Sequence, residues 1–174
     1  MIFKNTIFVG SNDGSLYAIN LSGVQIASYT TGASISHSSP VALNTAIYFG
    51  STDGNVYALS TSQLASHTLP LLWSYAIQSP ILTTPSIAYK TVYIAASDGN
   101  LYALNANASP GQLLWKLSIG TNITSSPKVI DGIVYIGSDN DNLYALWADD
   151  GSLIWTSPTG GAVESSPSVV LTTY

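Results

Sequence analysis

The chain has 174 residues with few charges, since Lys and Arg number 4, Asp and Glu number 9, and the formal net charge is −5. The four cations are isolated lysines and no cysteine is present, which excludes a basic stripe for nucleic acid, disulfides and thiolate chemistry. No apolar run approaches the roughly 20 residues of a membrane-spanning helix, so we expect no membrane span.

One short segment occurs four times in the chain. Its copies span residues 7–19, 47–59, 92–104 and 133–146, and their aligned tyrosines recur at intervals of 40, 45 and 42 residues. This period is typical of the four-stranded blades of a β-propeller. The sequence therefore predicts an all-β fold with four four-stranded antiparallel blades. The blades are predicted at about 1–32, 33–78, 79–120 and 121–160, with a spare innermost strand at 161–174.

Each repeat is predicted to open with an innermost strand A that follows a Ser/Thr-Pro step. Proline lacks an N–H group and belongs at the start or edge of a strand. A turn, clearest at Asp131 and Gly132, leads into strand B. Asp-Gly pairs such as Asp13-Gly14 then predict a two-residue primed turn between strands B and C, with both residues at positive φ. The fourth blade has Asn140-Asp141 at this place.

Strand C is predicted as Leu-Tyr-Ala-Leu or a close equivalent, and strand D ends near a tryptophan in the last three blades. Ala145, Gly151 and Trp155 resemble the tryptophan-docking motif of the pyrroloquinoline-quinone (PQQ) type propellers, the quinoprotein-like family. The resemblance covers essentially the whole chain. It departs at Ala27, which stands where the first blade should have its tryptophan, and in five extra residues between Ala58 and Trp73. We expect weaker packing between the first two blades.

The two ends of the chain share parts of one blade. Ile2 and Phe3 align with the middle of a strand A, while Ser166, Pro167, Val169 and Val170 repeat a strand A that no strand B follows. The resemblance implies a closed ring, usually with seven or eight blades. Two chains could make eight, this chain could be half of a longer polypeptide, or the spare strand could join a neighbouring subunit in a ring or filament.

Catalytic signatures are absent from the sequence, so we expect no enzyme. His37 and His67 have no metal-ligand spacing, and the hairpin acids 139–142 are expected to serve as turn residues. The position three residues before each strand-A proline varies, although the residues next to the proline are repeated. It is occupied by His37, Leu82, Thr124 and Glu164. We expect it at one mouth of the central channel. His37, Thr124 and Glu164 are candidate ligand contacts there.

The quinoprotein resemblance implies a quinone cofactor only where a vicinal disulfide, arginine and calcium ligands are present, and this chain lacks cysteine and arginine. We expect no cofactor and no metal site. The favoured interpretation is a non-enzymatic scaffold or binding module with protein partners, a homo-oligomer or part of a longer chain, located outside the cell or in its envelope. Three glycosylation sequons, at Asn20, Asn107 and Asn122, fit that location.

Two alternatives stay open. The chain could be a segment of a quinoprotein-like dehydrogenase whose active site lies in other blades. It could also bind carbohydrate, because Trp147 replaces the Asn20, Ser60 and Asn105 of the other repeats and could offer a stacking face.

Overall fold

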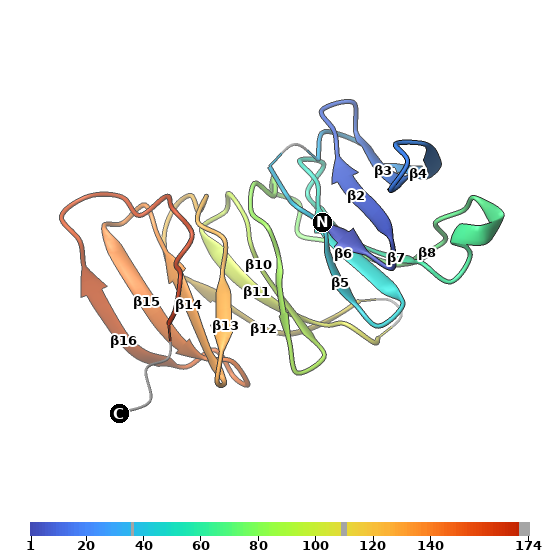
Figure 1. Cartoon of the computed structure of the whole chain (residues 1–174). Coiled ribbons are helices and arrows are strands. Elements are labelled where there is room, and N and C mark those ends of the chain that lie inside the picture. Colours follow the sequence, from blue (N-terminus) through green and yellow to red (C-terminus); the bar gives the residue numbers. More distant parts are fainter. Residues whose placement is uncertain (36, 109–110, 171–174) are drawn as a thin grey trace.

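The computed structural model describes residues 1–35, 37–108 and 111–170. It consists of four antiparallel sheets, each of four strands in sequence order from the innermost to the outermost. Figure 1 shows the sheets side by side in a row that does not close into a ring. The predicted all-β propeller fold with four blades is confirmed, and each sheet lies within one of the four predicted blade ranges.

The strands occupy equivalent places in the four repeats. The innermost strands A are β1 (Ile2–Phe3), β5 (Val41–Leu43), β9 (Ser86–Ala88) and β13 (Lys128–Ile130). The strands B are β2 (Thr6–Gly10), β6 (Ala46–Gly50), β10 (Thr91–Ala95) and β14 (Ile133–Gly137). The strands C are β3 (Ser15–Asn20), β7 (Asn55–Ser60), β11 (Asn100–Asn105) and β15 (Asn142–Trp147). The strands D are β4 (Gln25–Thr30), β8 (Leu71–Ala76), β12 (Gln112–Ser118) and β16 (Leu153–Pro158), and a short 3₁₀ helix, η1 (Leu64–Ser66), precedes β8.

The turns between strands A and B contain two residues. Asp131 and Gly132 connect β13 to β14 with φ of 48° and 78°, and Tyr89 and Lys90 connect β9 to β10 with φ of 52° and 65°. Two left-handed residues in succession define the primed turn whose twist matches that of the flanking strands. The turn predicted at Asp131 and Gly132 is confirmed.

The hairpin between strands B and C is a three-residue loop. In the first blade the Ser11 amide donates to the Ser15 carbonyl at 3.0 Å and the Gly14 amide donates to the Ser11 carbonyl at 3.2 Å. Gly14 has φ of +83°, whereas Asp13 keeps a negative φ. A type I turn followed by one left-handed residue gives this geometry. The prediction of a two-residue turn with both residues at positive φ is therefore wrong, because the loop needs a left-handed residue only at its end.

The outer pair of strands contains a bulge at the same place in every blade. The register between strands C and D shifts after Ala18, Ala58, Ala103 and Ala145. In the last three blades this alanine is paired across the ladder with a tryptophan. A bulge re-aims the side chains beside it. In these blades the alanine of strand C thus lies directly opposite the tryptophan of strand D.

The apolar core lies between neighbouring sheets. Between the second and third blades, Tyr48 and Trp73 pack against Val92 and Ile94 in one cluster of buried side chains. All residues of β6 and of β10 are buried, because these strands are covered on both faces. In the first blade, β2 alternates between buried and accessible residues. The two middle blades therefore contain the most completely buried part of the molecule.

The first two blades pack together without the missing tryptophan. Ala27, at the place of the indole, is 5% exposed and belongs to the same cluster as Leu69, while Leu64 packs against this cluster. Leu64 and Leu69 lie in the long segment between β7 and β8, and Nδ1 of His67 in that segment lies 2.9 Å from the carbonyl oxygen of Ile26. The insertion in the second blade thus covers the place where the first blade lacks its tryptophan. The place of the indole is thus filled, and weaker packing between these two blades stays a prediction.

Candidate functional site

A ladder of hydroxyl groups links the second, third and fourth blades and the spare segment where the chain enters each strand A. The Ser39 amide donates to Thr84 Oγ1 at 3.0 Å, the Thr84 amide to Ser126 Oγ at 2.9 Å, and the Ser126 amide to Ser166 Oγ at 3.0 Å. Each of these four residues immediately precedes a proline. The repeated Ser/Thr-Pro step therefore has two functions, because the proline opens a strand and the residue before it bonds to the next blade.

The predicted channel-mouth residues lie two positions before the members of this ladder. His37, Leu82 and Thr124 thus precede strand A of the second, third and fourth blades, and Glu164 lies at the matching place in the spare segment. His37 and Glu164 are exposed, whereas Leu82 and Thr124 are half-buried. Within residues 1–35, 37–108 and 111–170, no three His, Asp or Glu side chains form a group that could hold a metal ion. Ligand contact by His37, Thr124 and Glu164 stays a prediction.

The hairpin carboxylates on this face hold the loops in place. Asp53 accepts hydrogen bonds from the Tyr57 hydroxyl at 2.7 Å, the Gly32 amide at 2.8 Å and the Asn55 amide at 2.9 Å. Burial alone would raise the pKa of Asp53, but these hydrogen bonds outweigh it and lower the pKa below its ordinary value. Burial, followed by the hydrogen bond to Asp53, raises the pKa of Tyr57. The pair is thus a stable carboxylate and a neutral phenol.

Asp139 has the same structural task in the fourth blade. Its carboxylate accepts hydrogen bonds from the Thr121 amide at 3.1 Å, the Thr121 hydroxyl at 2.7 Å and the Asn122 amide at 2.9 Å. These bonds connect the loop that leaves the third blade to the hairpin of the fourth. The oxygens of Asp139 are therefore engaged by the protein itself, in keeping with the expected turn function.

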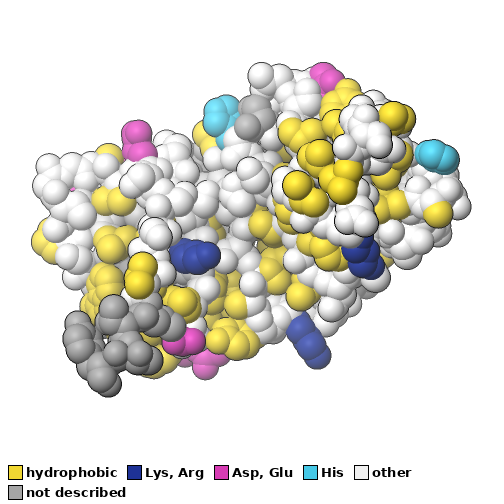
Figure 2. Space-filling model, viewed as in Figure 1, with side chains coloured by type: hydrophobic (Ala, Val, Ile, Leu, Met, Phe, Trp, Pro, Cys, Tyr) yellow, Lys and Arg dark blue, Asp and Glu magenta, His cyan; other side chains and the backbone are white. Residues whose placement is uncertain are grey.

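The outward face of the first blade exposes apolar side chains. Ile2 is 67% exposed and Val9 is 44% exposed, and Figure 2 shows hydrophobic side chains gathered over this blade. Ile2 pairs with Ile7 across the sheet, and the equivalent pair in the third blade is Ile87 with Val92. In the third blade this face packs against the second blade. We call the face formed by Ile2, Ile7, Val9, Tyr17 and Ile19 the amino-end face. It corresponds to a surface that is buried elsewhere in the same chain.

Within the chain, tryptophans connect the second blade to the third and the third blade to the fourth. Trp73 Nε1 donates to the Ala106 carbonyl at 3.2 Å, and Trp115 Nε1 donates to the Ala148 carbonyl at 3.1 Å. A Cβ on Gly151 would lie 2.6 Å from the indole of Trp115, so only glycine admits the ring at this distance. The indole of Trp115 thus packs on a glycine turn of the following blade, and a Cβ on Gly111 would likewise lie 2.6 Å from the indole of Trp73.

The outward face of the fourth blade presents the same arrangement, and no further blade of the described residues lies over it. The rings of Tyr135 and Trp155 lie 6.0 Å apart at 49°, and those of Tyr93 and Trp115 lie 5.9 Å apart at 50°. Trp73, which is covered by the third blade, is 4% exposed, whereas Trp155 is 40% exposed. We call the face formed by Tyr135, Leu143, Ala145 and Trp155 the carboxyl-end face. Its aromatic pair already has the geometry found at the inner interfaces.

The predicted assembly residues lie at opposite ends of the array. Ile2 and Phe3 form β1 of the first blade, whereas Ser166 is held against the fourth blade through the hydroxyl ladder. The described part of the spare segment, through Val170, contains no strand, because no strand B pairs with it. Pro167 and Val169 are half-buried, and Val170 is 81% exposed. Residues 171–174 of the predicted strand lie outside the described residues.

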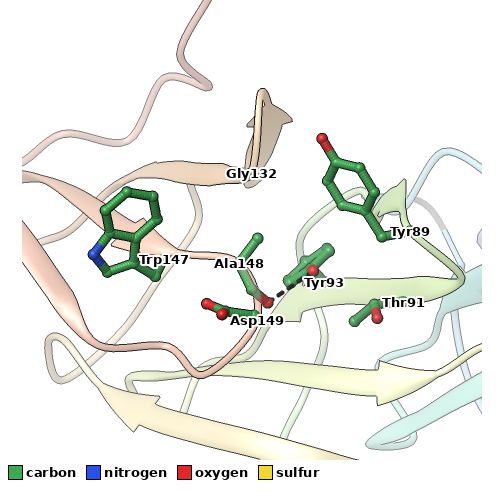
Figure 3. A pocket seen from close by; sticks show the side chains of 7 residues that line it. All are labelled: Tyr89, Thr91, Tyr93, Gly132, Trp147, Ala148 and Asp149. Atoms are coloured by element: carbon green, nitrogen blue, oxygen red, sulfur yellow. Dashed lines mark hydrogen bonds between the residues drawn. The ribbon is translucent and has the colours of Figure 1, made fainter.

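The structure also contains a pocket that the sequence did not indicate as a whole. It lies between the third and fourth blades, has a volume of about 430 Å³ and is lined by Tyr89, Thr91, Tyr93, Gly132, Trp147, Ala148 and Asp149. Figure 3 shows the rings of Tyr89 and Trp147 on opposite sides of this pocket. Trp147 was a candidate from the sequence and Tyr89 was missed. Aligning Tyr89 with Lys4, Asn44 and Asp131 of the other turns would have singled it out.

The sugar-attachment sequons differ in their accessibility. Asn107 and Asn122 are exposed, whereas Asn20 is half-buried and its Oδ1 accepts hydrogen bonds from the amides of Ser22 and Val24 at 3.0 and 2.9 Å. Asn20 thus also shapes the turn between β3 and β4. The helices present among the described residues are too short and too polar to cross a membrane.

Comparison with known proteins agrees with this geometry. Residues 106–171 match the model of a family described as outer membrane protein assembly factor BamB. The crystal structure of BamB from Moraxella catarrhalis is similar, with a TM-score of 0.81 and 18% identity over 97% of this chain and 54% of that chain. The computationally designed Ika8 protein has a TM-score of 0.79 and 18% identity over 95% of this chain and 50% of that chain. No curated protein matches the chain.

The solved structures show that the chain has the β-propeller fold. The match of residues 106–171 agrees with the PQQ-type repeats that the motifs resemble. The chain spans about half the length of the two solved structures that it matches.

Proposed function

We propose that this array is a non-enzymatic interaction module whose two end faces bind further propeller blades, supplied by a second copy of the chain. A single observation carries the proposal: the amino-end face and the carboxyl-end face are the repeat equivalents of the two sides of the inner interfaces. If a second copy extended the row of blades, its Ile2 and Val9 would contact Trp155 and Tyr135 of the first copy.

The chemistry of the two faces supports association. Both faces are apolar. Burying such surface contributes roughly 25 cal/mol of favourable free energy per Å², so association needs no charge pair. The aromatic pair at Tyr135 and Trp155 is already in position, so little side-chain order would be lost when it is covered. A contact between unlike faces is heterologous, and it gives a ring if the rotation closes and a filament if it does not.

The number of blades favours a ring of two copies. This chain has four blades and spans about half of each of the two similar solved structures. Two copies joined at both pairs of end faces would contain twice that number. The proposed assembly therefore has a defined mass, twice the 18.2 kDa of one chain.

Light scattering after size exclusion tests this assembly on the intact chain. We expect a mass of two chains, unchanged by added salt because the contact is apolar. Trp155→Glu and Val9→Glu should each give a single chain in solution. Leu114→Lys is the matched control, because Leu114 is 47% exposed on β12, away from both ends, and its replacement should leave the mass unchanged. A compact monomer of the unmodified chain at micromolar concentration would contradict the proposal.

Mixing the two end-face variants distinguishes unlike faces from like faces. The Trp155→Glu chain keeps its amino-end face and the Val9→Glu chain keeps its carboxyl-end face, so the mixture should form an open pair although neither forms one alone. Association of the Trp155→Glu chain with itself would instead mean that two amino-end faces meet.

We further propose that the module acts outside the cell or in its envelope. Support comes from the low charge, the sequons at Asn107 and Asn122, and the similarity of residues 106–171 to a family described as an outer membrane assembly factor. Fractionation of the native source tests the location, and recovery of the protein in the cytosolic fraction alone would refute it.

A further inference from the structure

Two aromatic residues that depart from the repeat meet at the pocket between the third and fourth blades. Tyr89 stands in the turn position held by Lys4, Asn44 and Asp131, and Trp147 ends strand C where the other blades have Asn or Ser. The two departures lie in different blades, 58 residues apart in the sequence, yet both line the same pocket. Neither aromatic ring is required by the fold, since the other blades form the same structure with polar, non-aromatic residues at these positions.

Tyr89 has an unfavourable backbone conformation and little burial to offset it. Its φ is 52°, a left-handed conformation that a bulky side chain rarely adopts, and its side chain is 68% exposed. Lys, Asn and Asp hold the equivalent position elsewhere in the chain, and Asn tolerates this conformation best. A strained residue that gains no packing points to a function of its side chain.

The walls and floor of the pocket differ in chemistry. Trp147, 48% exposed, and Tyr89 offer two flat aromatic surfaces on opposite sides. On the floor, Tyr93 donates its hydroxyl hydrogen to the Ala148 carbonyl at 2.9 Å, and burial raises the pKa of Tyr93, so it stays a neutral phenol. Asp149 adds an exposed carboxylate, which accepts hydrogen bonds. No cation lines the pocket among the described residues, which disfavours an anionic ligand.

We propose that this pocket binds a neutral pyranose sugar. A pyranose ring has C–H groups on its faces, which pack on aromatic rings, and hydroxyl groups at its edge, which donate to a carboxylate. Tyr89 and Trp147 would hold the ring faces, and Asp149 would accept from the edge hydroxyls. The volume of about 430 Å³ lies within the range of small-molecule sites.

The chain contains its own control for this site. The seam between the second and third blades has an equivalent pocket of about 300 Å³, with Asn44 in the place of Tyr89 and Tyr48 in the place of Tyr93. Asn105 occupies the position of Trp147 there. The two seams thus differ in the pair of aromatic side chains and in the carboxylate, because Asn107 stands in the place of Asp149. We expect only the seam between the third and fourth blades to bind sugar.

The test is calorimetry of the intact chain with a panel of neutral mono- and disaccharides built from glucose, galactose, mannose and N-acetylglucosamine. We expect at least one of them to bind, with a dissociation constant in the range of roughly 0.1–10 mM, because a small exposed site offers few contacts. Tyr89→Asn and Trp147→Asn, which install the residues of the equivalent seam, should each weaken binding at least tenfold. Asn44→Ala and Asn105→Ala should leave it unchanged.

Thermal melting separates a lost contact from a lost fold. Tyr89→Asn should raise Tm by about 2–4 °C, because asparagine relieves the left-handed strain, while sugar affinity falls. Three results would overturn the proposal: no sugar of the panel binds, binding survives both aromatic replacements, or tetramethylammonium binds while every sugar fails. The site lies within one chain, so these results are independent of the assembly of two copies.

Discussion

Among the hairpins between strands B and C, only the fourth has a non-glycine residue, Asp141, in the left-handed conformation. Asp141 has φ of 64° at the place where the first three blades have Gly14, Gly54 and Gly99, all at positive φ. The left-handed conformation costs a non-glycine residue about 1 kcal/mol or more. The fourth hairpin therefore contains removable strain.

Replacing Asp141 with glycine should stabilise the protein by about 1 kcal/mol, which corresponds to an increase in Tm of about 2–4 °C. Thermal denaturation followed by circular dichroism measures this change. The opposite replacement, Gly54→Ala, should destabilise, because φ there is +84° and a Cβ would lie 2.9 Å from the Ser79 amide nitrogen. Equal melting temperatures for all three proteins would contradict the assignment of strain.

The hydrogen-bonded carboxylates give the stability a defined pH dependence. Aspartates of the unfolded chain titrate near pH 3.9, and the pKa of Asp53 in the folded chain is lower, so the unfolded state takes up protons first as the pH falls. The stabilisation is present above about pH 4 and lost below it. Tyr57 acts at the other end, since its raised pKa makes stability decline as the pH rises above about 10.

Denaturation midpoints measured from pH 2 to pH 11 should therefore form a plateau between these limits. Asp53→Asn should lower the plateau and flatten the acid limb, because it removes one carboxylate with a lowered pKa. An acid limb that keeps its full slope in Asp53→Asn would assign the effect to the other aspartates, Asp13, Asp139 and Asp150, whose pKa values are lowered in the same direction.

At the scale of the elements, the segment between β7 and β8 replaces a missing side chain of another blade. Leu69→Ala should destabilise by about 2–4 kcal/mol, because it empties space beside Ala27 that no indole fills. Leu114→Ala is the control, since Leu114 is 47% exposed and its loss should cost much less. Urea denaturation measures both. A similar loss for the two variants would mean that the insertion does not support the first interface.

The repeated elements could be predicted because their signals are local. The period of Tyr17, Tyr57, Tyr102 and Tyr144 places the strands, and Asp131 with Gly132 specifies the inner turn. The length of the outer hairpin could not be derived in this way, because Asp-Gly suits both a two-residue loop and a three-residue loop in which only glycine is left-handed. The pairing of Ser11 with Ser15 decides between them.

The candidate sites depended on contacts that the linear pattern does not contain. Ala27 signalled a lost indole, but the replacement at Leu69 lies in another blade. Trp147 was visible as a departure from the repeat, whereas Tyr89 became meaningful only when the fold placed it across the same pocket. Serines before proline suggested strand starts, and their bonds between blades emerged from the geometry.

At the scale of the whole molecule, stability should vary along the row of blades. The middle strands β6 and β10 are buried throughout, whereas β2 and β14 contain partly accessible residues. Amide hydrogen exchange should therefore be slowest in the second and third blades of a dilute sample, because end blades of a linear array have one neighbour. Raising the protein concentration should slow exchange in the first and fourth blades if the end faces meet. Uniform protection at all concentrations would contradict a row with open ends.

The hydroxyl ladder has a consequence for how such a chain can change in length. Each step uses the same donor and the same acceptor, from Ser39 to Thr84, from Thr84 to Ser126 and from Ser126 to Ser166. An in-frame duplication of residues 79–120 would bring its own threonine, so every backbone amide of the ladder would still have a hydroxyl acceptor. Such a gene can thus gain a whole blade by duplication or lose one by deletion. The two end faces would stay the same, whatever the number of blades between them.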